Sequence, residues 1–99
     1  MADVYIREVE VVNLLGIHAR PSSQIAKLVN DLQIKNVFIE KVSEPGNKMN
    51  PASLLHMMMM GAVVGTKLIV FTNDENMHQG VDALVKLIES GFGEECVKK

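Results

Sequence analysis

The alternation of apolar and polar positions predicts the first strand and the first helix of the chain. Residues 8–11 alternate between polar and apolar, which is typical of a half-buried strand that begins near Tyr5. From Pro21 onward apolar residues recur with helical spacing, which predicts a helix ending between residues 30 and 32. Proline suits the first turn of a helix, because its missing N–H would have no partner there. The apolar stripe of this helix consists of Ile25, Leu28, Val29 and Leu32.

The next segment predicts a β-hairpin. Residues 36–40 are mostly apolar and include β-branched side chains, which indicates a short strand. Residues 43–47 contain serine, proline, glycine and asparagine, the residue types that favour turns. We therefore expect this turn to lead into a short partner strand around Lys48 and Met49. The turn over residues 42–48 is a few residues longer than usual, which should matter little for a surface hairpin.

A short helix and a long strand follow. Residues 50–53 are typical of a helix start, and the predicted helix over residues 54–60 ends at Gly61. Residues 66–72 form the most continuous strand pattern of the chain. Because such a pattern is typical of a strand covered on at least one face, this strand is predicted to lie at the centre of the sheet.

The last element is a helix, and it completes the fold class. Residues 73–76 turn the chain, and the helix ends at Gly91 and Gly93. The element order βαββαβα predicts an α+β two-layer sandwich of about four strands and three helices, with the helices on one face of the sheet. The apolar stripe of the last helix consists of Val81, Leu84, Val85 and Ile88.

Length and charge exclude several classes of function. A chain of 99 residues is one domain, residues 1–99, without room for a separate cofactor domain. Ten basic and twelve acidic residues give a net charge of −2, and the basic residues are scattered, so no nucleic-acid partner is expected. The lone Cys96 cannot form a disulfide or a cysteine zinc site within one chain, which favours a reducing cytosol. No apolar run approaches the ~20 residues of a membrane span, so no membrane insertion is expected.

The candidate chemistry lies at His18, between the end of a strand and the start of a helix. Unpaired backbone N–H groups and the helix dipole favour an anion such as phosphate at a helix N-terminus. The same positive end disfavours an imidazolium, so the ring is expected to stay neutral and nucleophilic. Arg20 adds a guanidinium suited to phosphate oxygens. These parts could take up a phosphoryl group on an imidazole nitrogen and pass it on.

Simpler interpretations exist for the same residues. His18 could merely cap the helix, and Ser22 and Ser23 are typical of a helix start. An acyl-transfer triad is not supported, because the chain has no G-x-S-x-G motif and no acid is predicted to orient His18. His78 and Cys96 are interpreted as incidental surface residues.

Three segments resemble one known family. Residues 16–21, Gly-Ile-His-Ala-Arg-Pro, resemble the active-site signature of HPr, the histidine-containing phosphocarrier of the bacterial phosphoenolpyruvate-dependent sugar phosphotransferase system. Residues 50–55 resemble the motif around the family's regulatory serine, and residues 81–88 resemble its last helix. The resemblance spans nearly the whole chain. It implies an open-faced βαββαβα sandwich with a four-stranded antiparallel sheet.

The resemblance also implies a function and its residues. His18 would accept a phosphoryl group on Nδ1 from Enzyme I and deliver it to the A components of sugar-specific enzyme II. Arg20 would stabilise the phosphate, and the backbone amides of Ala19 and Arg20 would donate to it. Such a protein is a cytoplasmic carrier rather than an enzyme, with no cofactor or metal, and is expected to be a monomer. Leu15 stands where many members have a small polar residue, so no hydrogen bond near the imidazole is expected from this position.

Ser53 and the helix after it are the second candidate region. Ser53 is predicted to cap the helix, and by the resemblance it is also a candidate for regulatory phosphorylation by an HPr kinase/phosphorylase. Leu54, Leu55 and Met58 would form an apolar patch that docks partners, since flexible methionines suit several partners. Core filling is expected to explain part of this apolar run. A copper site built from His56 and the methionines is a further alternative.

Three functions therefore remain open at this stage. The first is a phosphocarrier that works through His18. The second is a regulatory HPr-like protein that acts mainly through Ser53 and serves no sugar transport. The third is a structural or ligand-binding α+β module in which His18 is only a helix cap.

Overall fold

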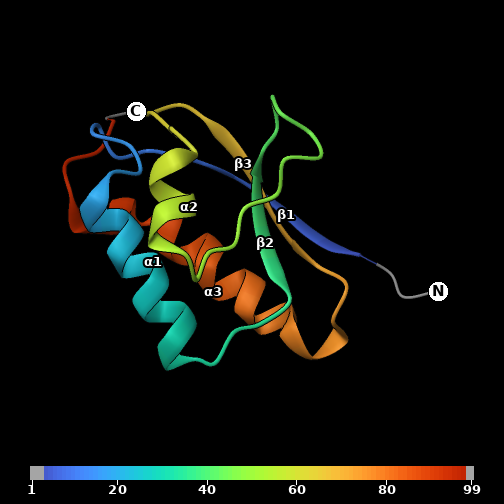
Figure 1. The fold of residues 1–99 in the computed structure, drawn as a ribbon. Coiled ribbons are helices and arrows are strands. Elements are labelled where there is room, and N and C mark those ends of the chain that lie inside the picture. Colours follow the sequence, from blue (N-terminus) through green and yellow to red (C-terminus); the bar gives the residue numbers. More distant parts are fainter. Residues whose placement is uncertain (1–3, 98–99) are drawn as a thin grey trace.

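The computed structural model describes residues 4–97 and confirms the predicted α+β class (Figure 1). The predicted boundaries of the main helices and of the central strand agree with it to within two or three residues. Among the described residues, no helix is both long and apolar enough to cross a membrane. The elements are β1 (Tyr5–Glu10), α1 (Ala19–Asp31), β2 (Val37–Lys41), α2 (Leu54–Met59), β3 (Lys67–Thr72) and α3 (His78–Glu89), with 3-10 turns at Glu75–Met77 and Gly91–Gly93.

The strands form an antiparallel sheet in the order β1-β3-β2. The central place of β3 confirms the prediction made from its continuous apolar pattern. In the register, Val9 pairs with Leu68 and Ile39 pairs with Val70, and all four side chains are buried. The inner face of the sheet is therefore a continuous apolar surface.

The expected fourth strand is reduced to one bridge in the described residues. Met49 and Ile39 exchange two backbone hydrogen bonds, with N···O distances of 2.7 and 3.0 Å. Pairing with β2 stops there because the next residue that would donate to β2 is Pro51, which has no N–H. The N–H of Asn50 points away from β2 and donates to Nδ1 of His56, at 3.2 Å. The hairpin prediction is thus confirmed, but the segment that starts α2 takes the backbone away from the sheet.

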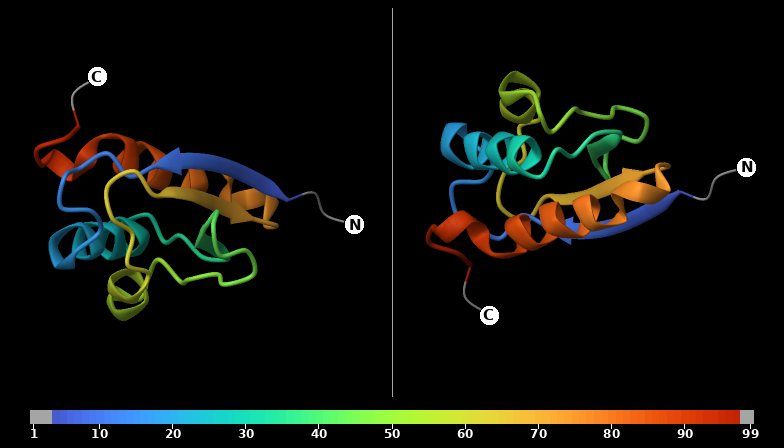
Figure 2. Two further views of the ribbon diagram at one scale, coloured as in Figure 1. Left: turned by 90° about the horizontal axis from the view of Figure 1, so that it is seen from above. Right: turned by 90° about the horizontal axis from the view of Figure 1, so that it is seen from below.

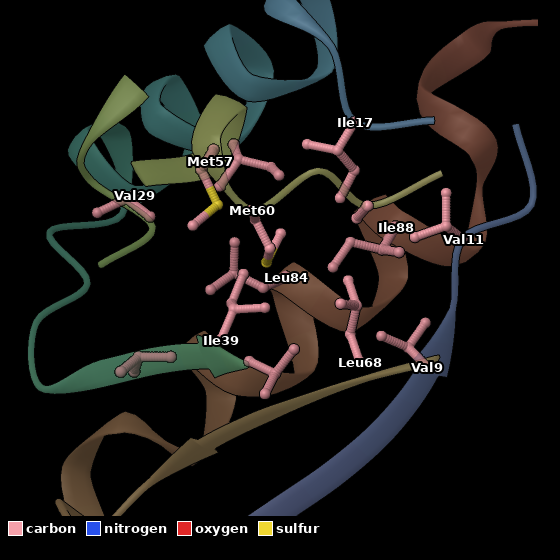
Figure 3. Close-up of a cluster of buried hydrophobic side chains, with 14 of the residues drawn as sticks. Val9, Val11, Ile17, Val29, Ile39, Met57, Met60, Leu68, Leu84 and Ile88 are labelled. Atoms are coloured by element: carbon pink, nitrogen blue, oxygen red, sulfur yellow. The ribbon is translucent and has the colours of Figure 1, made fainter. Parts of the chain in front are cut away.

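The helices supply the second layer and close a single core. Ile25 of α1, Met57 of α2 and Leu84 of α3 are fully buried and belong to one cluster with the inward residues of the strands. Figure 3 shows Ile39, Leu68 and the helical side chains gathered in this cluster. Along β3 the buried residues alternate with more exposed ones, so only one sheet face is covered. The predicted placement of the helices on one face is confirmed.

The helix ends follow local rules. Ser53 is the N-cap of α2, as predicted, and its hydroxyl accepts a hydrogen bond from the His56 N–H at 3.1 Å. Pro21 lies in the first turn of α1, as predicted.

Figure 2 shows the C-terminal end of α3 and the residues after it beside the loop that leads into α1. This neighbourhood brings together two segments that are far apart in the sequence.

His78 and Cys96 are more than incidental surface residues, which corrects the sequence-based interpretation. The His78 ring stacks on the Tyr5 ring, with centroids 4.1 Å apart and an interplanar angle of 9°. Tyr5 also donates its hydroxyl hydrogen to Asp82 at 2.8 Å, so this stack links β1 to α3. Cys96 forms a β-bridge with Asn13. Both residues connect parts of the fold that only the folded chain brings together.

Candidate functional site

The loop between β1 and α1 holds His18 in a defined position. Ile17 is buried, and its N–H donates to the carbonyl oxygen of Ala62 at 2.8 Å. Gly16 has φ +69°, and a Cβ at this position would lie 2.5 Å from the same carbonyl oxygen. Only glycine fits both this backbone conformation and this close approach. The loop is therefore held in close contact with the backbone at Ala62, in the segment that follows α2.

His18 is the N-cap residue of α1, as the sequence predicts. Its backbone is extended, and its carbonyl oxygen accepts a hydrogen bond from the N–H of Ser22 at 3.0 Å. Within the described part of the chain, its side chain makes no capping hydrogen bond, and 36% of that side chain is exposed. The first amides of a helix have no intrahelical partner, so the N–H groups of Ala19 and Arg20 are available to an anion. The imidazole of His18 is therefore not used to cap the helix.

A carboxylate orients His18, contrary to the expectation that no acid does so. Nε2 of His18 lies 2.9 Å from Oε2 of Glu94 and 3.2 Å from Oε1. The two residues are 76 positions apart, so neither spacing nor periodicity could have linked them. The only local signal was the pair of glycines that end the last helix and let the chain turn back.

Glu94 is held in place by backbone pairing and by a buried amide. Residues 95–97 pair with the loop before His18: Leu14 N–H donates to the Glu95 carbonyl, and Val97 N–H to that of Val12, each at 2.9 Å. The side-chain amide of the fully buried Asn13 donates to Glu94 Oε1 at 3.0 Å. It also donates to the Gly16 carbonyl at 2.7 Å. Asn13 therefore joins the His18 loop and the acid.

The ionisation of Glu94 decides which nitrogen of His18 carries the proton. The Asn13 hydrogen bond holds the pKa of the Glu94 carboxyl below its usual value, helped by His18 and Arg20 and opposed by partial burial. Glu94 is then a carboxylate at neutral pH and can only accept hydrogen bonds. Nε2 of His18 must therefore be the donor. In the neutral ring the lone pair is left on Nδ1.

Arg20 and Leu15 complete the surroundings of the imidazole. The Arg20 side chain is exposed, and its charge contributes to the lowered pKa of Glu94, so the guanidinium lies within electrostatic reach of the His18–Glu94 pair. Leu15 points to solvent, with 73% of the residue exposed. Glu94, which Asn13 holds in place, provides a polar contact to the imidazole that the sequence did not predict.

The lowered pKa of Glu94 predicts a specific pH dependence of stability. A carboxyl whose pKa is lower in the folded chain stabilises the fold above its unfolded pKa, about 4.5, and this stabilisation disappears as the pH falls through the lower folded pKa. As the pH falls from about 5 to below roughly 4, the free energy of unfolding of Glu94→Gln should therefore decrease less than that of the wild type. Denaturant unfolding at a series of pH values measures this. Parallel curves for the two proteins would contradict it.

The candidate docking patch is exposed on α2. Leu54, Leu55 and Met58 all reach solvent, with 64% of Leu55 exposed. Met57 and Met60 are buried in the core instead, which confirms that part of the apolar run fills the core. The sequence did not single out two further exposed apolar residues near the patch, Met59 and Val63.

The copper interpretation finds no support in this region. Buried Met57 and Met60 point away from exposed Met58 and Met59, so the four sulfurs do not converge. Nδ1 of His56 already accepts a hydrogen bond from the N–H of Asn50. Among residues 4–97, no group of three or more His, Cys, Asp or Glu side chains could hold a metal ion.

Comparisons with known proteins agree with this architecture. The chain matches the family model of the PTS HPr component phosphorylation site over residues 5–90. It is 31% identical over 88 residues to the phosphocarrier protein HPr of Cupriavidus necator, which covers 89% of this chain and 94% of the relative. It is 34% identical over 86 residues to the multiphosphoryl transfer protein of Haemophilus influenzae, covering 85% of this chain and 17% of that protein. The crystal structure of HPr-C-His from Thermoanaerobacter tengcongensis superposes with a TM-score of 0.77 at 27% identity, covering 92% of this chain and 98% of the other.

The fold and these relatives define a phosphocarrier protein of the phosphotransferase system. The chain belongs to the PTS HPr family. The resemblance stated from the sequence is therefore confirmed, and with it the fold class. Glu94 lies beyond residues 5–90, the part of the chain that the family model matches.

Proposed function

We propose that His18 accepts a phosphoryl group on Nδ1 from Enzyme I and passes it to the A components of sugar-specific enzyme II. The observation that carries this proposal is the contact between Nε2 of His18 and Glu94, which leaves the lone pair of the neutral ring on Nδ1. Membership of the PTS HPr family supports the two partners. The name of the Haemophilus relative, a multiphosphoryl transfer protein, also fits a phosphoryl relay.

The proposed acceptance step needs only one nucleophile and a place for the phosphate charge. The lone pair of Nδ1 forms a bond to phosphorus while the bond from phosphorus to the donor nitrogen of Enzyme I breaks, and that nitrogen keeps the electron pair. The amides of Ala19 and Arg20 and the exposed Arg20 guanidinium receive the phosphate oxygens. Because the partners supply the substrate pockets, the chain acts as a carrier rather than an enzyme.

The test is a labelling experiment with purified Enzyme I and phosphoenolpyruvate. The wild-type chain should acquire one phosphate that is stable in alkali and lost in acid, the behaviour of a phosphorylated imidazole. The A component of a sugar-specific enzyme II should then remove it. No acid-labile phosphate on the wild-type chain would overturn the proposal. An acid-stable phosphate on Ser53, made by an ATP-dependent kinase alone, would favour the regulatory alternative.

The exposed α2 residues are the proposed docking patch for these partners. Leu54, Leu55 and Met58 present apolar surface on a helix that packs beside α1, the helix that His18 begins. Exposed methionines can adapt to several partner surfaces. We expect the relay to work with the chain as a monomer in the cytoplasm, where the lone Cys96 stays reduced.

Ser53 is the proposed site of regulation by an HPr kinase/phosphorylase. Its side chain caps α2 directly before the docking patch, and it is half-buried. A phosphate there adds about −1.5 to −2 charges, which suits a helix N-terminus but repels an acidic partner surface. Phosphorylation would thus preserve the fold while weakening docking.

Ser53→Asp should reproduce the effect of that charge. The carboxylate can still cap α2, so the melting temperature should change by no more than a few degrees. We expect KM for phosphorylation by Enzyme I to rise about tenfold, a difference of roughly 1.4 kcal/mol, because one negative charge now stands beside the patch. Ser53→Asn is the matched control, since it caps without charge and should keep the wild-type KM. Equal KM values for both variants would contradict this role.

A further inference from the structure

We propose that Glu94 is a positioning residue for phosphoryl transfer: it keeps one proton on Nε2 of His18 through the whole cycle and balances the charge of the phosphorylated ring. This inference rests on the proposed function of His18 and adds to it a residue from the C-terminal segment. Glu94 lies beyond the residues matched by the family model, and sequence reasoning did not single it out.

The geometry of Glu94 is suited to this role. Its Oε2 lies 2.9 Å from Nε2 of His18, and only 10% of its side chain is exposed. The buried Asn13 holds the other oxygen at 3.0 Å, so the carboxylate cannot swing away without breaking that bond. A charge shielded from water interacts more strongly with a neighbouring charge than one in bulk solvent does. Glu94 is therefore placed to act on the ring rather than on the surrounding solution.

The backbone around Glu94 is also built for a fixed position. Asn13 and Cys96 form a β-bridge, and the Cys96 thiol donates to the Glu94 carbonyl at 3.3 Å. Gly91 turns the chain with φ +74°, and a Cβ there would collide with the Cys96 sulfur. The turn after α3 and the pairing with residues 12–14 thus fix the position of the Glu94 backbone relative to the imidazole of His18.

The charge balance of the transfer gives Glu94 its effect. The neutral ring carries its proton on Nε2 and uses the Nδ1 lone pair to bind phosphorus, so the phosphorylated ring is an imidazolium as long as Nε2 keeps that proton. When the phosphoryl group leaves, Nδ1 regains its lone pair and the ring is neutral again, without any proton transfer. A carboxylate beside Nε2 stabilises this charged form of the ring.

Two charged groups act on this ring from the elements packed around it. Glu94 faces Nε2 from the C-terminal segment, and Arg20 contributes positive charge from α1. Arg20 opposes a charged ring but attracts the phosphate oxygens. Because Arg20 is exposed and Glu94 is shielded, we expect the carboxylate to dominate at Nε2.

Glu94→Gln is the decisive variant, because it keeps the shape of the side chain at position 94 and changes the hydrogen bond that this side chain makes with His18. The Asn13 amide needs an acceptor, so the Gln oxygen should face Asn13 and the Gln NH₂ should face His18. An NH₂ group can only donate, so Nε2 would become the acceptor and the proton would move to Nδ1. The variant should therefore lose both the negative charge and the lone pair on Nδ1.

The experiment combines nitrogen NMR of ¹⁵N-histidine-labelled protein with phosphorylation kinetics. In Glu94→Gln we expect the unphosphorylated ring to shift toward the Nδ1–H tautomer. In the phosphorylated chain we expect the pKa of Nε2 to fall by about one unit, and kcat/KM with Enzyme I to fall about tenfold. Glu95→Gln is the matched control, because it removes the same charge from the exposed neighbour and should leave all three quantities unchanged. Glu94→Asp, which keeps the charge, should restore part of the pKa.

The outcomes separate this inference from the proposed function. If the wild-type chain takes up no acid-labile phosphate, the proposed function of His18 fails. If the wild type is phosphorylated normally while Glu94→Gln matches Glu95→Gln in tautomer, pKa and kcat/KM, the role of Glu94 is overturned. A Glu94→Gln variant that has lost rate while its tautomer and Nε2 pKa remain those of the wild type also overturns it, since a purely structural role predicts that pattern.

Discussion

His18→Ala should abolish the acid-labile phosphate that Enzyme I and phosphoenolpyruvate place on the wild-type chain. The variant loses the ring whose Nδ1 carries the lone pair, and the amides and Arg20 that would hold the phosphate have no nucleophile to assist. We expect labelling to fall by more than about 1000-fold, because removing the group that forms the covalent bond stops the reaction. Autoradiography of alkaline gels, followed by mild acid treatment, measures the label.

The other two histidines provide matched controls for this experiment. His56 is exposed on α2, and its Nδ1 accepts the Asn50 N–H. His78 stacks on Tyr5 at the start of α3. Neither has an orienting carboxylate on its Nε2 within the described residues, so His56→Ala and His78→Ala should keep the label. Loss of the label in either variant, or its survival in His18→Ala, would show that His18 is not the acceptor.

The loss in His18→Ala should come from chemistry rather than from unfolding. The His18 side chain makes no capping bond to α1 in the described structure, and alanine tolerates the extended backbone at this position. Glu94 keeps its hydrogen bond from Asn13 in the variant. We therefore expect far-UV circular dichroism and a cooperative melting transition like those of the wild type.

Gly16→Ala should cause a large loss of stability, although it adds only one methyl group. The new methyl group would lie 2.5 Å from the Ala62 carbonyl oxygen and 2.9 Å from Val63 Cα, and both are backbone atoms that cannot rotate away. The positive φ adds strain for any residue with a Cβ. Together these effects should lower the free energy of unfolding by about 3 kcal/mol, or the melting temperature by more than roughly 10 °C.

Gly46→Ala separates the collision from the backbone strain. Gly46 also has a positive φ, +87°, but a Cβ there would have no described atom within 4 Å. We expect a loss of only about 1 kcal/mol, from strain alone. Denaturant unfolding of both variants gives the comparison, and equal losses would contradict the role of the Ala62 contact. Gly16→Ala should also slow phosphorylation, because the loop that carries His18 is displaced.

Local features of the chain were predictable because they depend on neighbours within a few residues. Apolar spacing placed α1 and α3, and Pro21 lies in the first turn as expected. The side chain of Ser53 caps α2, and His18 stands at the N-terminus of α1. Helical periodicity and capping act over one or two turns, so they are visible in the sequence. The short pairing of Met49 was the exception: the sequence predicted a hairpin but not that pairing with β2 would end before Pro51, which has no N–H.

Only the tertiary structure showed which apolar residues of α2 are exposed and which are buried. Seven consecutive residues from Leu54 to Met60 include six apolar side chains, and their spacing did not say which would be buried. The packing of α2 against α1 and the core buries Met57 and Met60 and leaves Leu54, Leu55 and Met58 outside. The position of α1 beside α2 therefore determines which of these side chains are buried.

By itself, then, the sequence determined the order of elements, the histidine at a helix start and the family that these resemble. Only the tertiary structure decided that Glu94 meets His18, because that contact joins residues 76 positions apart. It depends on one local feature, the turn after α3, and on two long-range ones: the pairing of residues 95–97 with the loop before His18, and the buried amide of Asn13. A side chain placed by such pairing has no periodic signature in the sequence, so its chemical role appears only when the chain is folded.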